Sequence, residues 1–584
     1  MIRKLDPRQK ALFDPFHDRF SPVAYKTVTQ GWQGVFRHVI LELMAVDVLE
    51  GEFDPELGRP TKQLYSMAGL VFLMEFSDWT HEEAVRNYMF GQDVQYALNL
   101  PTEQVSLCTR TLERYLDIFR KNDLAARVSS EVTQALADAL EQDVRRQRLD
   151  SSHVFSNMAA FGRTRLMGVT IKRFLTQVKR HAPAAYETLP EALRGRYAAC
   201  EHRLFAEAAK DSDSRRRLRQ QVAEDLYELV ERFADDAAFQ GRSTYLALRR
   251  VFEEQCEVVQ DKVEVKAKTG GAVMQNPSDP DATYDGHKGP GYQAQFSETC
   301  SPANEVQLIL CVLPETAALS DGEAAAPVLE QLDASGLLPD ELAADTAYGS
   351  DENVQTCAGQ GVALVAPVPG KSPDAEQFTL ADFVIDETTE EVLQCPAGHA
   401  PIACAPDPDT GTTRTQMAPS ACAACPDRER CPVRQNQKSS RLDHSAKQRR
   451  IDQRRRGQDT EAFRERYTIR SGIESTNSGV KRRTGLGRLR VRGKQAVFQA
   501  IFLKAAGWNV LRASASKKMR ALVARRIQEA LAGIFETAEK SGKKGFLVQN
   551  QGLIETFRTA LNSICRPRIS TRNHVNTAFV CATA

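Results

Sequence analysis

The order of apolar and polar positions predicts helices in the first quarter of the chain. From Val35 to about Phe119 apolar residues recur at helical spacing, with a strongly apolar helix over Tyr65–Phe76. We therefore expect a helical domain over 35–140. Compact helices suit both a DNA-binding head and an ordinary helical bundle, and we interpret this domain as DNA-binding. Residues 1–34 show little periodicity and are expected to form an arm.

After about Val144 the pattern becomes one of strands separated by helices. The expected strands lie near 148–157, 291–297, 305–313, 341–345 and 362–366, with a helix over 321–334. This order predicts a mixed α/β domain over 141–515.

Two segments interrupt this predicted domain. Residues 166–260 are helical and highly charged, and residues 370–455 combine Pro, Gly, Asp and clustered Cys, so both are interpreted as insertions. Helices are expected again over 459–482 and 494–512. Residues 516–584 are expected to hold a C-terminal helix, Met519 to Lys540, and a tail.

Composition and charge narrow the class of protein. The chain is 42% hydrophobic and 26% charged, as in soluble globular proteins. Its net charge of only +1 means that the charge of the whole chain does not by itself point to a polyanionic partner. Residues 441–494 differ, because they carry 17 Lys/Arg against 6 Asp/Glu, a net of +11. Such a block is either a solvated face or a nucleic-acid patch. Without an apolar segment of bilayer-spanning length or a secretory signal, we expect a cytoplasmic protein with reduced cysteines and no membrane partner.

Four residues inside the basic block form a candidate functional stripe. Read as one helix, Tyr467, Arg470, Glu474 and Lys481 fall within about 60° of one another. One carboxylate is thus flanked by two cations and a phenol. This combination suits a group that holds a metal ion while its neighbours bind phosphate.

Two upstream acids could complete a site with Glu474. Asp150 lies near the middle of the first predicted strand, and Asp345 ends a later one. Mg²⁺ prefers oxygen ligands and binds through a few carboxylates plus substrate phosphate. Three acids on two strands and a helix would suit metal-assisted phosphodiester cleavage, although a single Asp among 76 acidic residues is weak support on its own.

The spacing Tyr467-x2-Arg470-x3-Glu474-x6-Lys481 matches the Tyr-Arg-Glu-Lys signature of the DDE transposases of bacterial insertion sequences. The segments 149–157 and 343–350 resemble that family's two Asp motifs. Residues 276–284 and 288–295 resemble the segment that lies between those motifs, and 35–120 resembles the helical N-terminal domain of one branch. Altogether the resemblance covers most of 35–515.

The resemblance implies an RNase H-like catalytic core and a transposase that cleaves DNA at insertion-sequence ends and transfers the strands to target DNA. It implies that Asp150, Asp345 and Glu474 are catalytic ligands of Mg²⁺, for which Mn²⁺ can substitute. It further implies a homodimer on DNA, within the bacterial nucleoid when bound. The expected DNA contacts are Tyr467, Arg470, Lys481, Arg482 and Arg483.

Two other functions remain open for this chain. It could be a catalytically silent DNA-binding protein of transposase origin, or an RNase H-like nuclease that cuts without joining.

The cysteines of the second insertion form a candidate zinc site. Cys422-x2-Cys425-x5-Cys431 follows Cys395, and His399 or Cys404 could substitute for one member of the set. Structural zinc takes four tetrahedral N/S ligands, of which a CxxC pair supplies two. Reduced surface thiols in a loop are the alternative.

Overall fold

The protein divides into two compact units. The structure, a computed structural model, describes residues 2–7, 14, 16, 19–100, 105–205, 211–372, 374, 376–407, 409–436 and 439–540. Unit 1 comprises Met1–Val71, His81–Tyr115 and Val510–Ala584, and unit 2 comprises Phe72–Thr80 and Leu116–Asn509. The predicted helical domain over 35–140 is therefore shared between the units.

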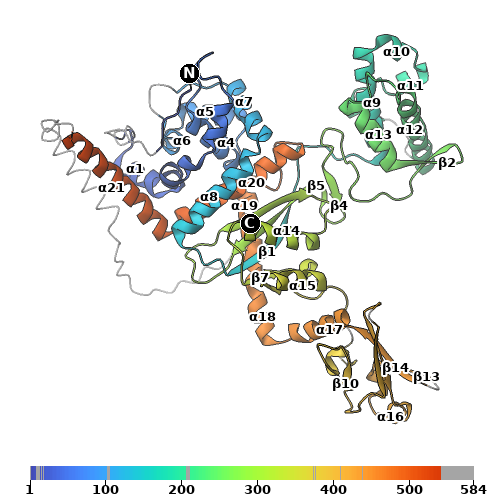
Figure 1. Ribbon diagram of the computed structural model, residues 1–584. Coiled ribbons are helices and arrows are strands. Elements are labelled where there is room, and N and C mark those ends of the chain that lie inside the picture. Colours follow the sequence, from blue (N-terminus) through green and yellow to red (C-terminus); the bar gives the residue numbers. More distant parts are fainter. Residues whose placement is uncertain are drawn as a thin grey trace, which may run out of the picture. The chain divides into compact units, whose positions relative to one another are not determined.

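Unit 1 is helical and includes both ends of the described chain (Figure 1). Its helices, two of which continue into unit 2, are α1 (Pro22–Gln30), α2 (Trp32–Val35), α3 (Val46–Gly51), α4 (Leu64–Phe76), α5 (His81–Phe90), α6 (Gln92–Ala97), α7 (Thr109–Lys121) and α21 (Lys517–Lys540). The expected arm contains α1, which Ser21 caps by accepting a hydrogen bond from the Ala24 N–H at 3.3 Å. A Ser followed by a Pro is a common start of a helix, so this pair was the feature of the sequence that could have predicted α1.

The C-terminal helix α21 packs within the same unit. Arg526 donates to the Glu42 carboxylate at 2.7 Å and to the His38 carbonyl at the same distance. The predicted C-terminal helix is thus present and tied to N-terminal residues. The tail expected after it, 541–584, lies outside the described residues.

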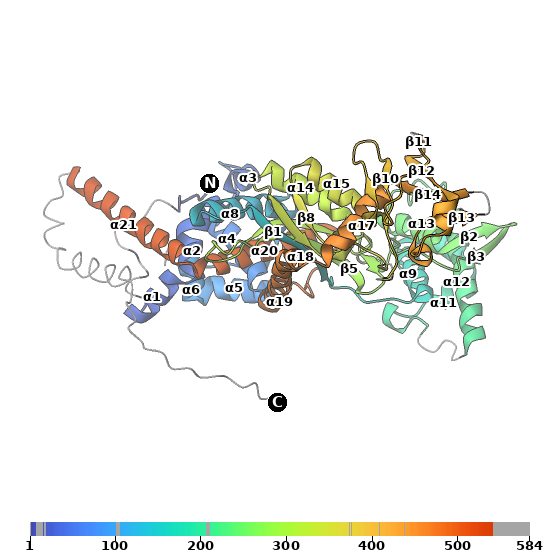
Figure 2. The same ribbon diagram turned by 90° about the horizontal axis from the view of Figure 1, so that it is seen from below.

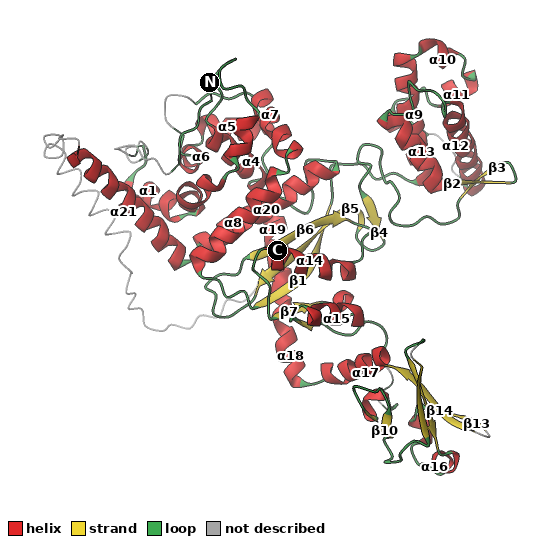
Figure 3. Cartoon of the chain, in the orientation of Figure 1, coloured by secondary structure: helices red, strands yellow, loops and turns green. Residues whose placement is uncertain are grey.

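Unit 2 is built around a mixed sheet (Figure 3). Its strands are β1 (Arg146–Val154), β4 (Thr283–Asp285), β5 (Gly289–Thr299), β6 (Ile309–Thr316), β7 (Glu341–Ala344) and β8 (Ala363–Val365). They follow the order β4-β5-β1-β7-β8, and β6 also pairs with β5. β5 is antiparallel to both β1 and β6. β7 is parallel to each of its two neighbours, β1 and β8. The predicted mixed α/β sheet is confirmed.

Two helices near the end of the described chain cover one face of this sheet. α19 (Gly472–Thr484) and α20 (Lys494–Ser514) share a buried cluster with the sheet, to which β5 contributes Tyr292, Ala294 and Phe296. α8 (Leu124–Leu140) and α14 (Ala325–Ala334) contact β6, and α15 (Asp351–Gly359) contacts β8. Burial of these apolar residues fixes α19 against the strand that carries Asp150.

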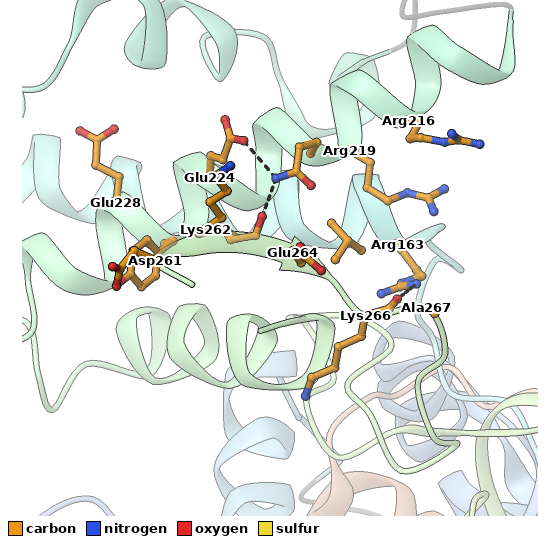
Figure 4. A pocket seen from close by; sticks show the side chains of 14 residues that line it. Arg163, Arg216, Arg219, Glu224, Glu228, Asp261, Lys262, Glu264, Lys266 and Ala267 are labelled. Atoms are coloured by element: carbon orange, nitrogen blue, oxygen red, sulfur yellow. Dashed lines mark hydrogen bonds between the residues drawn. The ribbon is translucent and has the colours of Figure 1, made fainter. Parts of the chain in front are cut away.

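The first insertion forms a helical body with its own core. It contains α9 (Arg163–His181), α10 (Pro183–Glu187), α11 (Glu191–Arg196), α12 (Ser212–Arg232), α13 (Ser243–Gln255) and the hairpin β2 (Cys256–Val259)–β3 (Lys262–Val265). An open groove lies between α12 and the hairpin, with Arg216 and Arg219 toward one end and Glu228 toward the other (Figure 4). None of the predicted site residues lines it.

The second insertion is a folded β unit. Its elements are β9 (Val384–Ile385), β10 (Val392–Gln394), β11 (Ala403–Asp407), β12 (Thr412–Met417), α16 (Pro419–Ala423), β13 (Arg434–Asn436) and β14 (Ser439–Ser445). Four of the strands form one sheet in the order β11-β12-β14-β13. Helices α17 (Ala446–Gln458) and α18 (Glu461–Thr468) lead from it back to the α/β core. Nowhere in the described part of the chain does a helix combine the length and the apolar character that membrane crossing requires.

Candidate active site

Strand pairing brings Asp150 and Asp345 together. Leu149 of β1 pairs with Ala344 of β7 in parallel register, so the next residue on each chain is an aspartate. Asp345 leaves the strand as the cap of a short turn, where its carboxylate accepts from the Ala347 N–H at 2.8 Å. Two acids 195 positions apart in the sequence therefore occupy neighbouring positions at the end of this strand pair.

Glu474 is held near these acids by the docking of α19 on β1 and β5 (Figures 1 and 2). Arg148 of β1 forms an ion pair with Glu298 of β5 at 2.6 Å, and Glu298 is almost fully buried. Thr476 of α19 donates to the other Glu298 oxygen at 2.6 Å. A charge this deeply buried needs such partners, so the network fixes where α19 sits on the sheet.

Two glycines allow α19 to approach its neighbours closely. A side chain at Gly472 would run into the Arg148 guanidinium, and one at Gly479 would lie 2.5 Å from the Trp508 ring.

The helix that the sequence predicts over 459–482 is divided into two helices in the structure. α18 ends at Thr468, one tight turn covers Ile469–Ser471, and α19 then begins at Gly472.

The three predicted carboxylates converge on the Arg470 guanidinium. Its nitrogens lie 2.8 Å from Glu474, 3.3 Å from Asp150 and 3.9 Å from Asp345. Asn477, one turn beyond Glu474, donates to the second Asp150 oxygen at 3.0 Å. The structure thus gathers the predicted acids around one cation, and it adds Asn477, which sequence reasoning missed.

The electrostatics of Asp150 follow from these contacts. Burial raises the pKa of Asp150, the nearby Asp345 carboxylate raises this pKa further, and Arg470 opposes both effects. Arg470 therefore offsets only part of the cost of charging Asp150, and a further cation close to this carboxylate would favour its charged form.

The other predicted DNA contacts lie in different surroundings. Tyr467 is stacked on Phe463 with ring centroids 5.7 Å apart, and the Arg483 guanidinium lies 4.7 Å from the centre of the Phe76 ring. Arg482 is exposed, whereas Lys481 is half-buried. Within the described chain Lys481 forms no ion pair with a carboxylate. Burial lowers the pKa of Lys481, and the nearby Lys288 lowers it further.

Lys288 is a second residue that sequence reasoning passed over. Its ammonium lies 3.0 Å from the Ser151 hydroxyl and 3.4 Å from the Asp321 carboxylate. Ser151 also donates to Asp321 at 2.9 Å. The turn that carries Lys288 is therefore attached to the strand of Asp150, a contact that only long-range folding reveals.

The chemistry of this donor set fits a hard divalent cation. All three side chains offer carboxylate oxygens, which Mg²⁺ and Mn²⁺ prefer. The guanidinium of Arg470 stands where these oxygens converge and neutralises part of their charge. No group of three or more His, Cys, Asp or Glu residues in the described chain is arranged to hold a metal ion.

The predicted cysteine set lies apart from these acids, in the second insertion. Cys395, Cys422, Cys425 and Cys431 line one small cavity together with His399. Cys404 does not line it, and its thiol instead contacts the Val392 carbonyl and the Thr415 hydroxyl.

Comparison with protein families gives one match. Residues 394–513 match a family described as a transposase DDE domain. This range contains all four predicted zinc ligands, the whole Tyr467–Lys481 stripe and all but the last residue of α20. It covers about a fifth of the chain and supports a DDE transposase. No curated protein and no solved structure matches the chain.

Proposed function

We propose that this protein is a DDE transposase that cleaves DNA at the ends of an insertion sequence and joins those ends to target DNA. The observation that carries the proposal is the convergence of Asp150, Asp345 and Glu474 on Arg470. These acids come from two parallel strands and a helix, and part of the site lies in the segment that matches the transposase DDE domain. The mixed sheet, antiparallel on one side of β1 and parallel on the other, supports an RNase H-like core.

The three carboxylates would hold Mg²⁺, with Mn²⁺ as a substitute. When bound, the metal would supply the charge stabilisation that phosphodiester cleavage and transfer require. Arg470 neutralises part of the charge of these acids through its ion pairs with Asp150 and Glu474. Asn477 holds one Asp150 oxygen by a hydrogen bond and so limits the orientations of that carboxylate.

Lys481 has the properties of a phosphate contact. It is a half-buried ammonium seven residues beyond Glu474 on α19. Burial lowers its pKa, and Lys288 lies close enough to lower it further. Two neighbouring ammonium groups attract a polyanion, and a DNA phosphate would relieve their mutual repulsion. Arg482 and the basic residues that follow extend this charge, while Tyr467 borders the acids.

The helical domain over 35–140 is proposed as a further DNA-binding part, and two protomers are proposed to act together on a pair of ends. The protein would work in the bacterial cytoplasm, at the nucleoid. These assignments rest on the family resemblance.

A comparison of two glutamate variants tests the proposal. Glu474→Gln removes a charge from the site, and Glu465→Gln removes one from the exposed surface of the preceding helix. Both variants and the unmodified protein are incubated with Mg²⁺ and a DNA fragment that carries the sequences flanking the gene. We expect Glu474→Gln to lose cleavage by at least about 10²–10³-fold, the scale for removing a group that stabilises transition-state charge, with binding retained. Glu465→Gln should cleave normally.

The products separate the proposal from its alternatives. Joined strands in the unmodified protein support a transposase, whereas cleavage without joining indicates a nuclease. Binding without cleavage in the unmodified protein indicates a silent DNA-binding protein. Equal loss of binding and cleavage in Glu474→Gln would contradict the role given to Glu474.

A further inference from the structure

We propose that the second insertion binds one structural Zn²⁺ through Cys395, Cys422, Cys425 and Cys431. The site would be independent of the carboxylates around Arg470 and would serve the fold of the insertion rather than the reaction. Four features of this insertion favour a metal site. They are a small cavity, short turns that carry the cysteines, a donor that contacts one of the sulfur atoms, and a small apolar core.

The four cysteines surround one cavity of about 20 Å³. About 10–15 Å³ is needed for a single water, so this space accommodates one particle of that size. Met417 and Val433, both buried, line it beside the cysteines, and the polar residues His399, Asp427, Arg428 and Gln435 complete the lining. Four cysteine side chains around one space of this size suit a thiophilic ion.

The cysteines occur in short turns that are typical of zinc sites. Cys395, Cys425 and Cys431 each precede a proline, and Cys422 and Cys425 are separated by two residues. Each lies at or just beyond the end of a short element. Cys395 follows β10, Cys422 lies in the last turn of α16, and Cys431 follows a tight turn over Arg428–Arg430. Their side chains can therefore turn toward the cavity without disturbing the sheet.

A hydrogen-bond donor already points at one of the sulfur atoms. The His399 backbone N–H donates to the Cys395 sulfur at 3.4 Å. A donor of this kind stabilises a thiolate and orients a ligand around a metal ion.

The thiols share one space, because all four cysteines line the same cavity. A divalent cation bound there deprotonates the thiols that hold it. All four cysteines are free in the structure. No three His, Cys, Asp or Glu residues in the described chain, these cysteines included, are arranged to hold a metal ion. Zinc binding therefore requires the four sulfur atoms to move toward the centre of the cavity.

The insertion has a reason to need a metal ion, because its apolar core is small. Its six buried members are Leu380, Phe383, Val392, Met417, Val433 and Leu442, with Cys395, Cys404, Cys422 and Cys431 packed against them. Units of this size usually depend on disulfides or a structural metal for stability. In a cytoplasmic protein zinc is the expected choice.

Zinc binding to the full-length, reduced protein tests the proposal. The chelator-treated protein is titrated with Zn²⁺ against a chromophoric indicator, and we expect one tight site per chain together with proton release. Cys431→Ser and Cys422→Ser should weaken binding by more than about 100-fold, since even outer-shell substitutions cost 10–100-fold. Cys404→Ser is the matched control, because Cys404 packs against the same core without lining the cavity. Its zinc affinity should not change.

A second measurement needs no variant and so does not depend on the folding of one. Alkylation of the unmodified protein, with and without Zn²⁺, is mapped by mass spectrometry. Zn²⁺ should protect the four ligands at least tenfold, while the exposed Cys108 and Cys200 react equally in both samples. The proposal would be overturned if the four cysteines were alkylated equally with and without Zn²⁺, or if well under one Zn²⁺ bound per chain. Disulfide bonds among these four cysteines in the reduced protein would also overturn it. None of these outcomes bears on the transposase proposal.

Discussion

The Arg470 guanidinium lies 3.3 Å from the Asp150 carboxylate, with Glu474 on its other side at 2.8 Å. Arg470 opposes the burial that raises the pKa of Asp150. In Arg470→Gln this pKa should rise further, so a higher pH is needed to ionise the site. We expect cleavage to fall by about 10–100-fold at neutral pH, and the acid limb of the pH–rate profile to move to higher pH.

A neighbouring arginine provides the control for Arg470→Gln. Arg466 lies four residues earlier and pairs with Glu341 at the surface. Arg466→Gln should leave the pH–rate profile where it is. A profile that is identical in Arg470→Gln and the unmodified protein would show that Arg470 does not set the protonation of Asp150.

Replacement of Asp150 should stabilise the resting protein. The folded-state pKa of Asp150 is raised, so its carboxyl favours folding below the unfolded-state pKa and loses that contribution as pH rises through the folded-state value. At pH 7 the ionised group is therefore unfavourable. Asp150→Asn cannot ionise and retains an oxygen for Asn477. We expect a gain on the order of 1 kcal/mol, a usual size when an active-site conflict is relieved, together with loss of cleavage.

Thermal unfolding without divalent ions measures this effect. The difference in melting temperature between Asp150→Asn and the unmodified protein should be positive at pH 7 and shrink toward pH 4. A variant that is less stable at pH 7 would indicate that the ion pair with Arg470 outweighs the cost of burying the charge.

Two glycine substitutions should have opposite effects on stability. Gly479 faces the Trp508 ring, so a new Cβ would overpack a rigid neighbour, at a cost of typically 1–3 kcal/mol. Gly457 lies in α17 with open space around it, so Gly457→Ala should stabilise by about 0.5–1 kcal/mol. Urea unfolding monitored by tryptophan fluorescence compares the two. Equal gains would mean that α19 shifts away from Trp508 at little cost.

The candidate site illustrates which features a sequence can reveal. The spacing from Tyr467 to Lys481, the strand-like contexts of Asp150 and Asp345 and the family resemblance together selected three acids, which the fold brings to one place. Their helix stripe also predicted that Arg470 neighbours Glu474. It could not predict that this guanidinium reaches Asp150, because that contact depends on how α19 docks on the sheet. The buried Arg148–Glu298 pair and the close approach at Gly472 decide that docking.

The second insertion shows why part of the fold escaped detection. β12 alternates regularly between buried and exposed positions, but its buried side chains are Thr413, Thr415 and Met417. In β14 they are Ser440, Leu442 and His444. A search for alternating aliphatic residues does not find strands whose inner face is largely Thr, Ser and His. Cysteine spacing was the stronger signal in this segment.

Lys481 should bind DNA phosphate with a pH dependence of its own. Burial and the nearby Lys288 lower its pKa, so it loses its charge at a lower pH than an ordinary lysine. Lys481→Met should weaken DNA binding and reduce the slope of log K against log salt by about 1. Lys481→Arg keeps the charge and should hold its affinity as pH rises into the alkaline range, where the unmodified protein weakens.

Binding isotherms at several salt concentrations and two pH values measure these effects. Lys371→Met is the charge-matched control, because Lys371 is exposed and lies outside the stripe. It should leave the slope unchanged. If Lys481→Met and Lys371→Met lowered the slope equally, the effect would be one of net charge alone, and Lys481 would not be the phosphate contact that its half-buried, unpaired ammonium indicates.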